Sequence, residues 1–374
     1  MVQDTLEELK QVILGIVPKS AGVTNIELEG PEIAVYLRNP NVLVEDTEIV
    51  KAIARKVRKR IVVRSDPSVR LPPEEAEKII RERVVEEAGI TGISFDNNLG
   101  EVIIEAKKPG LVIGKNGVTL REITRATRWR PVVIRTPPIS SKMVERVRGV
   151  LQAEKEKRME FLRNVGRRIH RPLVFKNGWL RIVTLGGFRE VGRTAILVQT
   201  PESSILVDCG VNVGGGGGAF PYLDLPEFDI ENLDAVVVTH AHLDHSGFVP
   251  FLFKYGYDGP VYCTTPTRNL MTLLQLDYLE VAEREGKITP YSQKDVKKAV
   301  IHTIPLEYGE VTDIAPDVRL TLHNAGHILG SAIVHLHIGD GLHNIAYTGD
   351  FKFSKTRLLE PACNTFPRLE TMII

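Results

Sequence analysis

Cysteine is scarce in this sequence. The 374 residues include only Cys209, Cys263 and Cys363, and so few scattered thiols exclude a disulfide framework and a four-cysteine zinc site. Long apolar runs are also missing, since none approaches the ~20 residues that cross a membrane. The start, Met1-Val2-Gln3-Asp4, lacks the basic and apolar regions of a signal peptide. We therefore expect a cytoplasmic protein with no membrane partner.

Neither sign of charge dominates, because the chain contains 48 Lys and Arg residues and 47 Asp and Glu residues. The balance is nevertheless divided along the chain. Residues 1–178 contain 33 basic and 24 acidic side chains, whereas residues 179–374 contain 15 and 23. A basic half suits a polyanion and an acidic half suits a metal site. The same division of charge is explained equally well if the charged residues are only the solvent-exposed side chains of helices.

One pattern of elements occurs twice before residue 140. A helix, two strands, a helix and a strand run from Asp4–Ile16 to Arg60–Arg64, and again from Glu74–Ala88 to Pro131–Arg135. We expect two small αββαβ domains, at residues 1–70 and 71–139. A single charged helix from Ser140 to Arg171 is predicted to form a linker over residues 140–177.

From residue 178 to 374 the sequence alternates β-branched strands with helices, which predicts an α/β domain. The apolar strand Asp234–Thr239 leads directly into His240-Ala241-His242-Leu243-Asp244-His245. Imidazole and carboxylate donors without thiolate favour an open, catalytic zinc site. The glycine run Gly214–Gly218 is expected to form a loop near the same edge.

Three more candidate ligands follow predicted strands. Asp208, His327 and Asp350 each stand at or just beyond a strand end. A lone histidine there would more often be an ordinary polar residue, but the whole set would be costly to bury without a cation. His335 and His337 alternate within an apolar strand and are interpreted as packed side chains.

The stretch Thr239–Gly247 resembles the signature of the metallo-β-lactamase superfamily, and Asp208, His327 and Asp350 match its other motifs in order. The residues after Gly247 and the Thr-Gly-Asp that ends at Asp350 are similar to the β-CASP nucleases. With two small domains in front, the chain resembles the archaeal KH-domain-containing β-CASP ribonucleases. The implied fold is two KH-like domains followed by the N-terminal half of a metallo-β-lactamase αββα sandwich.

This resemblance implies a zinc-dependent RNA endonuclease, with 5′-to-3′ exonuclease as a second activity, acting in 3′-end formation or transcription termination. Two Zn²⁺ would hold a hydroxide at neutral pH and bind the phosphoryl oxygens. Its ligands would be His240, His242 and His327 at one zinc, Asp244 and His245 at the other, and Asp350 between them. Asp208 would orient a histidine, and Asp208 and Asp244 are the acids assigned to catalysis.

In the β-CASP family, the last ligand of the second zinc and a general acid lie beyond the fourth motif. This sequence continues for only 24 residues after Asp350. We therefore expect a portion of a longer protein that, by itself, binds the second metal weakly and cuts RNA poorly or not at all. The implied partners are single-stranded RNA and the transcription machinery, and a homodimer would form through the region beyond this chain.

The second small domain contains Gly114-Lys115-Asn116-Gly117. A Gly-x-x-Gly loop of this kind is how KH domains clamp single-stranded RNA. Arg121 would extend the basic surface. The first domain has Pro40–Asp46 at the corresponding place, which favours a packing role there.

Two other functions stay open at this point. One is a metallo-β-lactamase-fold hydrolase of small esters, which the paired KH-like domains disfavour. The other is a non-catalytic RNA-binding scaffold, which the complete set of candidate ligands disfavours.

Overall fold

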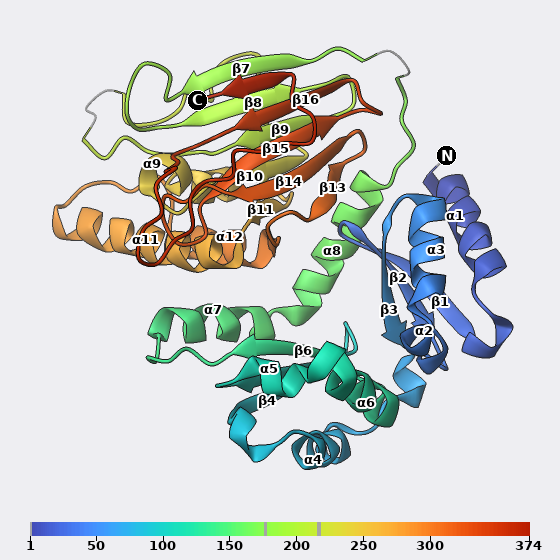
Figure 1. The fold of residues 1–374 in the computed structure, drawn as a ribbon. Helices are drawn as coiled ribbons and strands as arrows, with labels where there is room; N and C mark the ends of the chain where they lie inside the picture. Colours follow the sequence, from blue (N-terminus) through green and yellow to red (C-terminus); the bar gives the residue numbers. More distant parts are fainter. Residues whose placement is uncertain (1, 176–177, 215–217) are drawn as a thin grey trace. The chain divides into compact units, whose positions relative to one another are not determined.

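The computed structural model describes residues 2–175, 178–214 and 218–374, and it is drawn in Figure 1. Residues 215–217 of the glycine run therefore lie outside the described residues. The chain divides into two compact units. The first runs up to Glu145 and adds Gln152–Arg167, and the second comprises Arg146–Leu151 and Arg168–Ile374. Among the described helices none is long and apolar enough to cross a membrane.

The first unit contains the predicted repeat. Its first copy consists of α1 (Val2–Ile16), β1 (Val23–Glu29), β2 (Glu32–Leu37), α2 (Asn41–Glu45), α3 (Thr47–Val57) and β3 (Arg60–Ser65). β1 pairs antiparallel with β2, and β2 pairs parallel with β3. Ile13 of α1, Ile33 of β2 and Ile53 of α3 are fully buried in the core of this copy.

The second copy repeats this topology. It consists of α4 (Pro73–Arg83), β4 (Ile90–Asp96), β5 (Glu101–Ala106), α5 (Pro109–Ile113), α6 (Val118–Thr127) and β6 (Arg130–Arg135). β4 and β5 are antiparallel and β5 and β6 are parallel. Each copy is thus αββααβ, because a short helix, α2 or α5, precedes the longer one. Five residues are too few to show a helical period, so this helix was not predicted.

The prediction of one long helix after residue 140 was wrong. Two helices occupy this region, α7 (Lys142–Ala153) and α8 (Lys155–Ile169), with a break at Glu154. Ser141 begins α7, since its hydroxyl accepts a hydrogen bond from the amide of Val144 at 3.4 Å. The five residues 154–158 are all charged. No apolar side chain anchors the helix across the junction, so the chain can turn there.

The second unit contains two sheets. The larger has the order β12-β11-β10-β9-β8-β7, and the smaller the order β13-β14-β15-β16-β17. The strands of the larger sheet are β7 (Arg181–Gly186), β8 (Ala195–Gln199), β9 (Ser204–Val207), β10 (Ala235–Val237), β11 (Val261–Cys263) and β12 (Thr303–Pro305). Those of the smaller are β13 (Val311–Ala315), β14 (Val318–Asn324), β15 (Ala332–Ile338), β16 (His343–Tyr347) and β17 (Thr371–Ile373).

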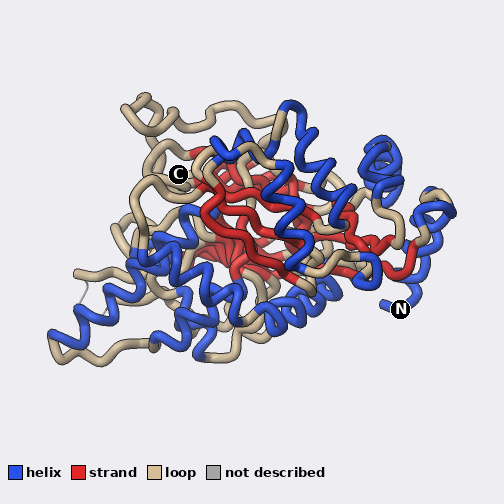
Figure 2. Tube along the Cα trace, turned by 90° about the horizontal axis from the view of Figure 1, so that it is seen from below, coloured by secondary structure: helices blue, strands red, loops and turns tan. Residues whose placement is uncertain are grey.

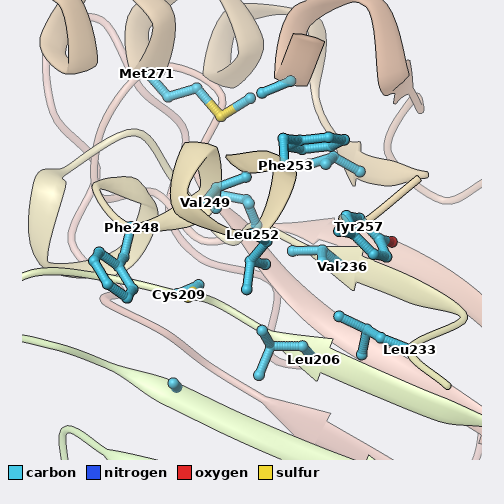
Figure 3. Close-up of a cluster of buried hydrophobic side chains, with 14 of the residues drawn as sticks. Leu206, Cys209, Leu233, Val236, Phe248, Val249, Leu252, Phe253, Tyr257 and Met271 are labelled. Atoms are coloured by element: carbon cyan, nitrogen blue, oxygen red, sulfur yellow. The ribbon is translucent and has the colours of Figure 1, made fainter. Parts of the chain in front are cut away.

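Strands β9, β10 and β11 are buried on both faces, which is typical of a sheet covered on both sides. One face packs on α10 (Val249–Lys254), α11 (Thr265–Arg284) and α12 (Gln293–His302). Figure 3 shows this core, and Leu206 and Val236 of the sheet belong to the same buried cluster as Leu252 and Met271 of the helices. The smaller sheet lies on the other face (Figure 1). Figure 2 marks the helices, strands and loops along the same chain trace.

Candidate metal centre

The candidate ligands lie where strands of the two sheets end. Asp208 directly follows β9, and its amide donates to the carbonyl of Val237 in β10 at 2.8 Å. His240 comes three residues after β10, and Asp350 comes three residues after β16. Loops at the carboxyl ends of parallel strands are the usual place for a site in an α/β fold.

The short helix α9 (Leu243–Ser246) includes both Asp244 and His245, with His242 as its N-cap. This turn is held against the first sheet, because the amide of Thr194 donates to the carbonyl of Asp244 at 2.9 Å. Gly210 lies so close that a Cβ there would stand 1.7 Å from the same carbonyl oxygen.

The first group of donors comprises His240, His242, His327 and Asp350. One ligand atom from each lies within 4.8 Å of all the others. Nε2 of His240 is 3.1 Å from Nδ1 of His242, which is 3.3 Å from Nε2 of His327. Oδ2 of Asp350 lies 3.4 Å from Nε2 of His327. Three ring nitrogens and one carboxylate oxygen therefore converge on one point.

A second group forms around Nε2 of His245. Oδ2 of Asp244 lies 3.8 Å from it, and Oδ1 of Asp350 lies 3.6 Å from it. The two oxygens of Asp350 thus face different groups, Oδ2 the first and Oδ1 the second.

Asp208 is fully buried and organises both groups. Nδ1 of His245 donates to its Oδ2 at 2.7 Å. The hydroxyl of Thr239 also donates to Oδ2, at 2.8 Å, and accepts from Nδ1 of His240 at 3.0 Å. Because both Nδ1 atoms carry a proton in these contacts, the Nε2 atoms of His240 and His245 present lone pairs to their groups. Asp208 adopts φ +59°, a left-handed conformation that Asp tolerates better than most residues.

Hydroxyl groups hold the turn that carries His327. Oγ of Ser331 accepts from the amides of His327 and Ile328 at 3.1 and 3.2 Å. Thr264 and Thr267, at the start of α11, both donate to the carbonyl of Gly330, at 2.8 and 2.9 Å.

The pKa values of His240 and His327 favour neutral imidazoles at these two positions. Burial, followed by repulsion from the other three histidines, lowers the pKa of His240 to about 2. Burial also lowers the pKa of His327. Burial acts in the same direction on His245, but the charge and hydrogen bond of Asp208 outweigh it and raise the pKa of His245.

This donor set fits divalent cations. Ring nitrogens with lone pairs face each other and carboxylate oxygens at short range, an arrangement that repels unless a cation lies between them. Nitrogen and oxygen donors of this kind suit zinc. Metal binding needs deprotonated ligands, and the low pKa of His240 provides one.

Three side chains that the sequence did not indicate belong to this centre. Thr239 and Ser331 were read only as neighbours of ligands. Tyr347, at the end of β16, has its pKa raised well above the ordinary value by burial and then by Asp208, Asp350 and Asp244, and it hydrogen-bonds to Asp208. Its position just before Thr348-Gly349-Asp350 is the one signal that could have found it.

The remaining histidines make other contacts. His335 is fully buried and contacts His323 at 3.3 Å and the carbonyl of Arg368 at 3.0 Å. His337 contacts Thr321 and Asn344. Within the described residues no metal-type cluster includes these side chains.

The Gly-x-x-Gly loop lies between α5 and α6 in the first unit. Gly114, Asn116 and Gly117 have φ values of +73°, +52° and +73°, which favour glycine and asparagine. A Cβ at Gly114 would stand 2.3 Å from Oγ1 of Thr119, so this position has room only for glycine. Arg121 donates to the carbonyl of Asn116 at 2.8 Å and so supports the loop beside Lys115.

The first repeat has acidic residues at the corresponding place. Asp46 caps α3 by accepting from the amide of Glu48 at 3.0 Å. Glu45 pairs with Arg125 of α6 at 2.9 Å. Negative charge at a helix start repels phosphate, and this surface is already in contact with the second repeat.

Family models match three parts of the chain. Residues 189–368 match the metallo-beta-lactamase superfamily, and residues 75–149 match the KH domain. Residues 3–70 match the KH domain of transcription termination factor FttA. The chain thus contains two KH domains followed by a metallo-β-lactamase-fold domain, and its fold is the expected one. This fold implies binding of divalent metal.

Particular relatives extend over the whole chain. Proteins named transcription termination factor FttA are 57% identical in Methanothermobacter thermautotrophicus, 56% in Thermococcus kodakarensis and 52% in Lokiarchaeum. The matches cover 99–100% of this chain but only 58–59% of those proteins. The chain is therefore a close homologue of these archaeal factors and spans less than two thirds of their length.

Proposed function

We propose that this protein is a zinc-dependent ribonuclease that hydrolyses phosphodiesters in single-stranded RNA. The observation that carries this proposal is that the two carboxylate oxygens of Asp350 face different groups of ligands. Its Oδ2 faces His240 and His327, and its Oδ1 faces His245. A carboxylate placed in this way suits two cations held side by side, and the fold belongs to a superfamily of hydrolases.

His240, His242 and His327 would hold one Zn²⁺, Asp244 and His245 the other, and Asp350 both. Two zinc ions would supply a nucleophile at neutral pH and neutralise charge on the phosphoryl group. The chain's own residues prepare this site. Asp208 and Thr239 keep the protons of His240 and His245 on Nδ1, and Ser331 positions the His327 turn.

RNA is the substrate that best fits the rest of the chain. Residues 75–149 form a KH domain with an intact Gly-x-x-Gly loop, and such loops bind four nucleotides of single strand. The homologues are named transcription termination factors. We therefore place the cleavage in transcription termination, with endonuclease and 5′-to-3′ exonuclease action both within the proposal.

The first test is metal content. Zinc bound by the whole protein is measured by isothermal titration and elemental analysis for the wild type, for an Asp244→Ala/His245→Ala variant, and for Asp277→Ala as an exposed control. We expect two zinc ions in the wild type and the control, and one in the double variant. A single ion in the wild type would refute the two-metal centre.

The second test is cleavage of labelled single-stranded RNA by the whole protein and by its Asp244→Ala/His245→Ala variant. The nuclease proposal requires zinc-dependent products that the variant lacks. Equal products, or RNA that is bound without being cut, would favour the scaffold function instead.

A further inference from the structure

A cavity of about 480 Å³ opens beside the turn that carries His327. This volume lies in the range of about 300–1,000 Å³ that is usual for ligand sites. Seven of its lining residues are apolar or aromatic: Pro266, Leu306, Tyr308, Ile328, Leu329, Leu358 and Leu359. Leu329 and Leu358 are 59% and 92% exposed. Exposed apolar side chains around a hollow mark a binding surface.

Tyr308 is fixed in this wall and still presents its ring. Its hydroxyl donates to the carbonyl of Ser331 at 2.8 Å, and its backbone forms a bridge with Leu322. The side chain remains 43% exposed. Ser331 is also the residue whose hydroxyl holds the amides of His327 and Ile328. The ring is therefore anchored to the same turn as a candidate metal ligand, and little entropy is lost when something stacks on it.

The charges of the cavity suit a base better than a phosphate. Glu307 and Glu360 line it, and none of the described residues that line it is Lys or Arg. Glu360 is paired with Lys355 at 2.9 Å. Carboxylates repel phosphate, but they accept hydrogen bonds from exocyclic amino groups such as that of cytosine. Aromatic rings stack on bases of any sequence.

We propose that this cavity binds one nucleobase of the RNA whose phosphate lies at the metal centre, with the base stacked on Tyr308. The inference rests on the proposed function and adds a specificity site to it. A base that carries an exocyclic amino group is preferred, because Glu307 lines the same cavity as Tyr308.

The test is photocrosslinking of this chain to a short single-stranded RNA that contains 5-iodocytidine, with zinc and in parallel with chelator. Crosslinked peptides are identified by mass spectrometry for the wild type, Tyr308→Phe, Tyr308→Ala and Tyr255→Ala. Tyr255 is a matched control, because it is 58% exposed and does not line the cavity. We expect a crosslink within residues 306–331 in the wild type, Tyr308→Phe and Tyr255→Ala. Tyr308→Ala should reduce it roughly 5- to 100-fold, as loss of one base stack does.

The outcome separates this site from the proposed function. If the whole protein cuts RNA with zinc but the cavity gives no crosslink, or gives the same one in Tyr308→Ala, the base site is refuted and the nuclease stands. If the crosslink forms while the whole protein with zinc cuts no RNA, the base site stands and the nuclease does not. Absence of any crosslink in the cavity would also point to a protein segment as its occupant, and so against our proposal.

Discussion

Nδ1 of His245 lies 2.7 Å from Oδ2 of Asp208, the same oxygen that accepts the hydroxyl hydrogen of Thr239. One buried carboxylate therefore sets the tautomer of a histidine in each donor group. Partners of this kind typically contribute 10–100-fold to metal affinity.

We predict that Asp208→Asn weakens zinc binding by roughly 10- to 100-fold. The amide cannot accept both protons as well as a carboxylate does. Thr239→Val should act mainly on the His240 group, and Thr239→Ser should retain wild-type affinity because it keeps the hydroxyl. Competition with a chromophoric chelator measures each constant. Equal affinity in Thr239→Val and the wild type would show that the hydroxyl does not position His240.

A second prediction concerns the ion pair inside the first unit. Arg64 of β3 is 3% exposed and donates to Glu29 of β1 at 2.7 Å and to Glu101 of β5 at 3.1 Å. Burial raises the pKa of Glu29, although Arg64 opposes this. Arg64→Ala leaves a buried carboxylate unpaired and should lower the free energy of unfolding by about 3–5 kcal/mol.

Arg60 provides the control for this experiment. It pairs with Glu32 at 2.9 Å but is 45% exposed, so Arg60→Ala should cost no more than about 1 kcal/mol. Urea denaturation of both variants gives the comparison. If both variants lost a similar amount of unfolding free energy, the buried ion pairs of Arg64 would contribute no more to stability than an exposed pair does.

The RNA clamp yields a third prediction. Lys115 stands between Gly114 and Asn116 in the Gly-x-x-Gly loop. Lys115→Ala should weaken binding of single-stranded RNA at every sequence and reduce the slope of log affinity against log salt by roughly 0.7, the value for one phosphate contact. Lys51→Ala in the first repeat should leave the slope unchanged. Fluorescence anisotropy over a series of salt concentrations measures both variants.

The buried histidines of the smaller sheet give a pH-dependent prediction. Burial, followed by the charges of His337 and His323, lowers the pKa of His335 to about 4, whereas an unfolded histidine titrates near ~6.5. The unfolded chain therefore binds a proton below ~6.5 that the folded chain does not, and stability falls as the pH drops from there towards 4. Unfolding of the wild type and of His335→Gln across this range should show a shallower decline in the variant. Parallel curves would contradict this account.

The local part of the site could be predicted from the sequence. His240, His242, Asp244 and His245 lie within six residues after an apolar strand, so that their proximity needs no tertiary information. Asp208, His327 and Asp350 could be added because each stands at or just beyond a predicted strand end and matches, in order, a motif of the metallo-β-lactamase superfamily. The repeat in the first unit was visible for a similar reason, since its helices and strands carry regular apolar spacing.

Other features have no such signature. The hydroxyls of Thr239, Thr264 and Ser331 act through contacts with distant backbone, and threonine and serine occur in every kind of loop. The cavity beside Tyr308 joins segments that lie far apart in sequence. The break at Glu154 has neither proline nor glycine to mark it, because it arises from the absence of an apolar anchor.

The donors of the candidate metal centre come from both sheets, and this has a consequence for the order of folding. His245 meets a partner 37 residues away and His242 one that is 85 residues away. Closing such long loops is slow compared with forming the hairpins of β14, β15 and β16. The centre should therefore be completed last, and acquisition of metal by newly made protein would report that both sheets have already assembled.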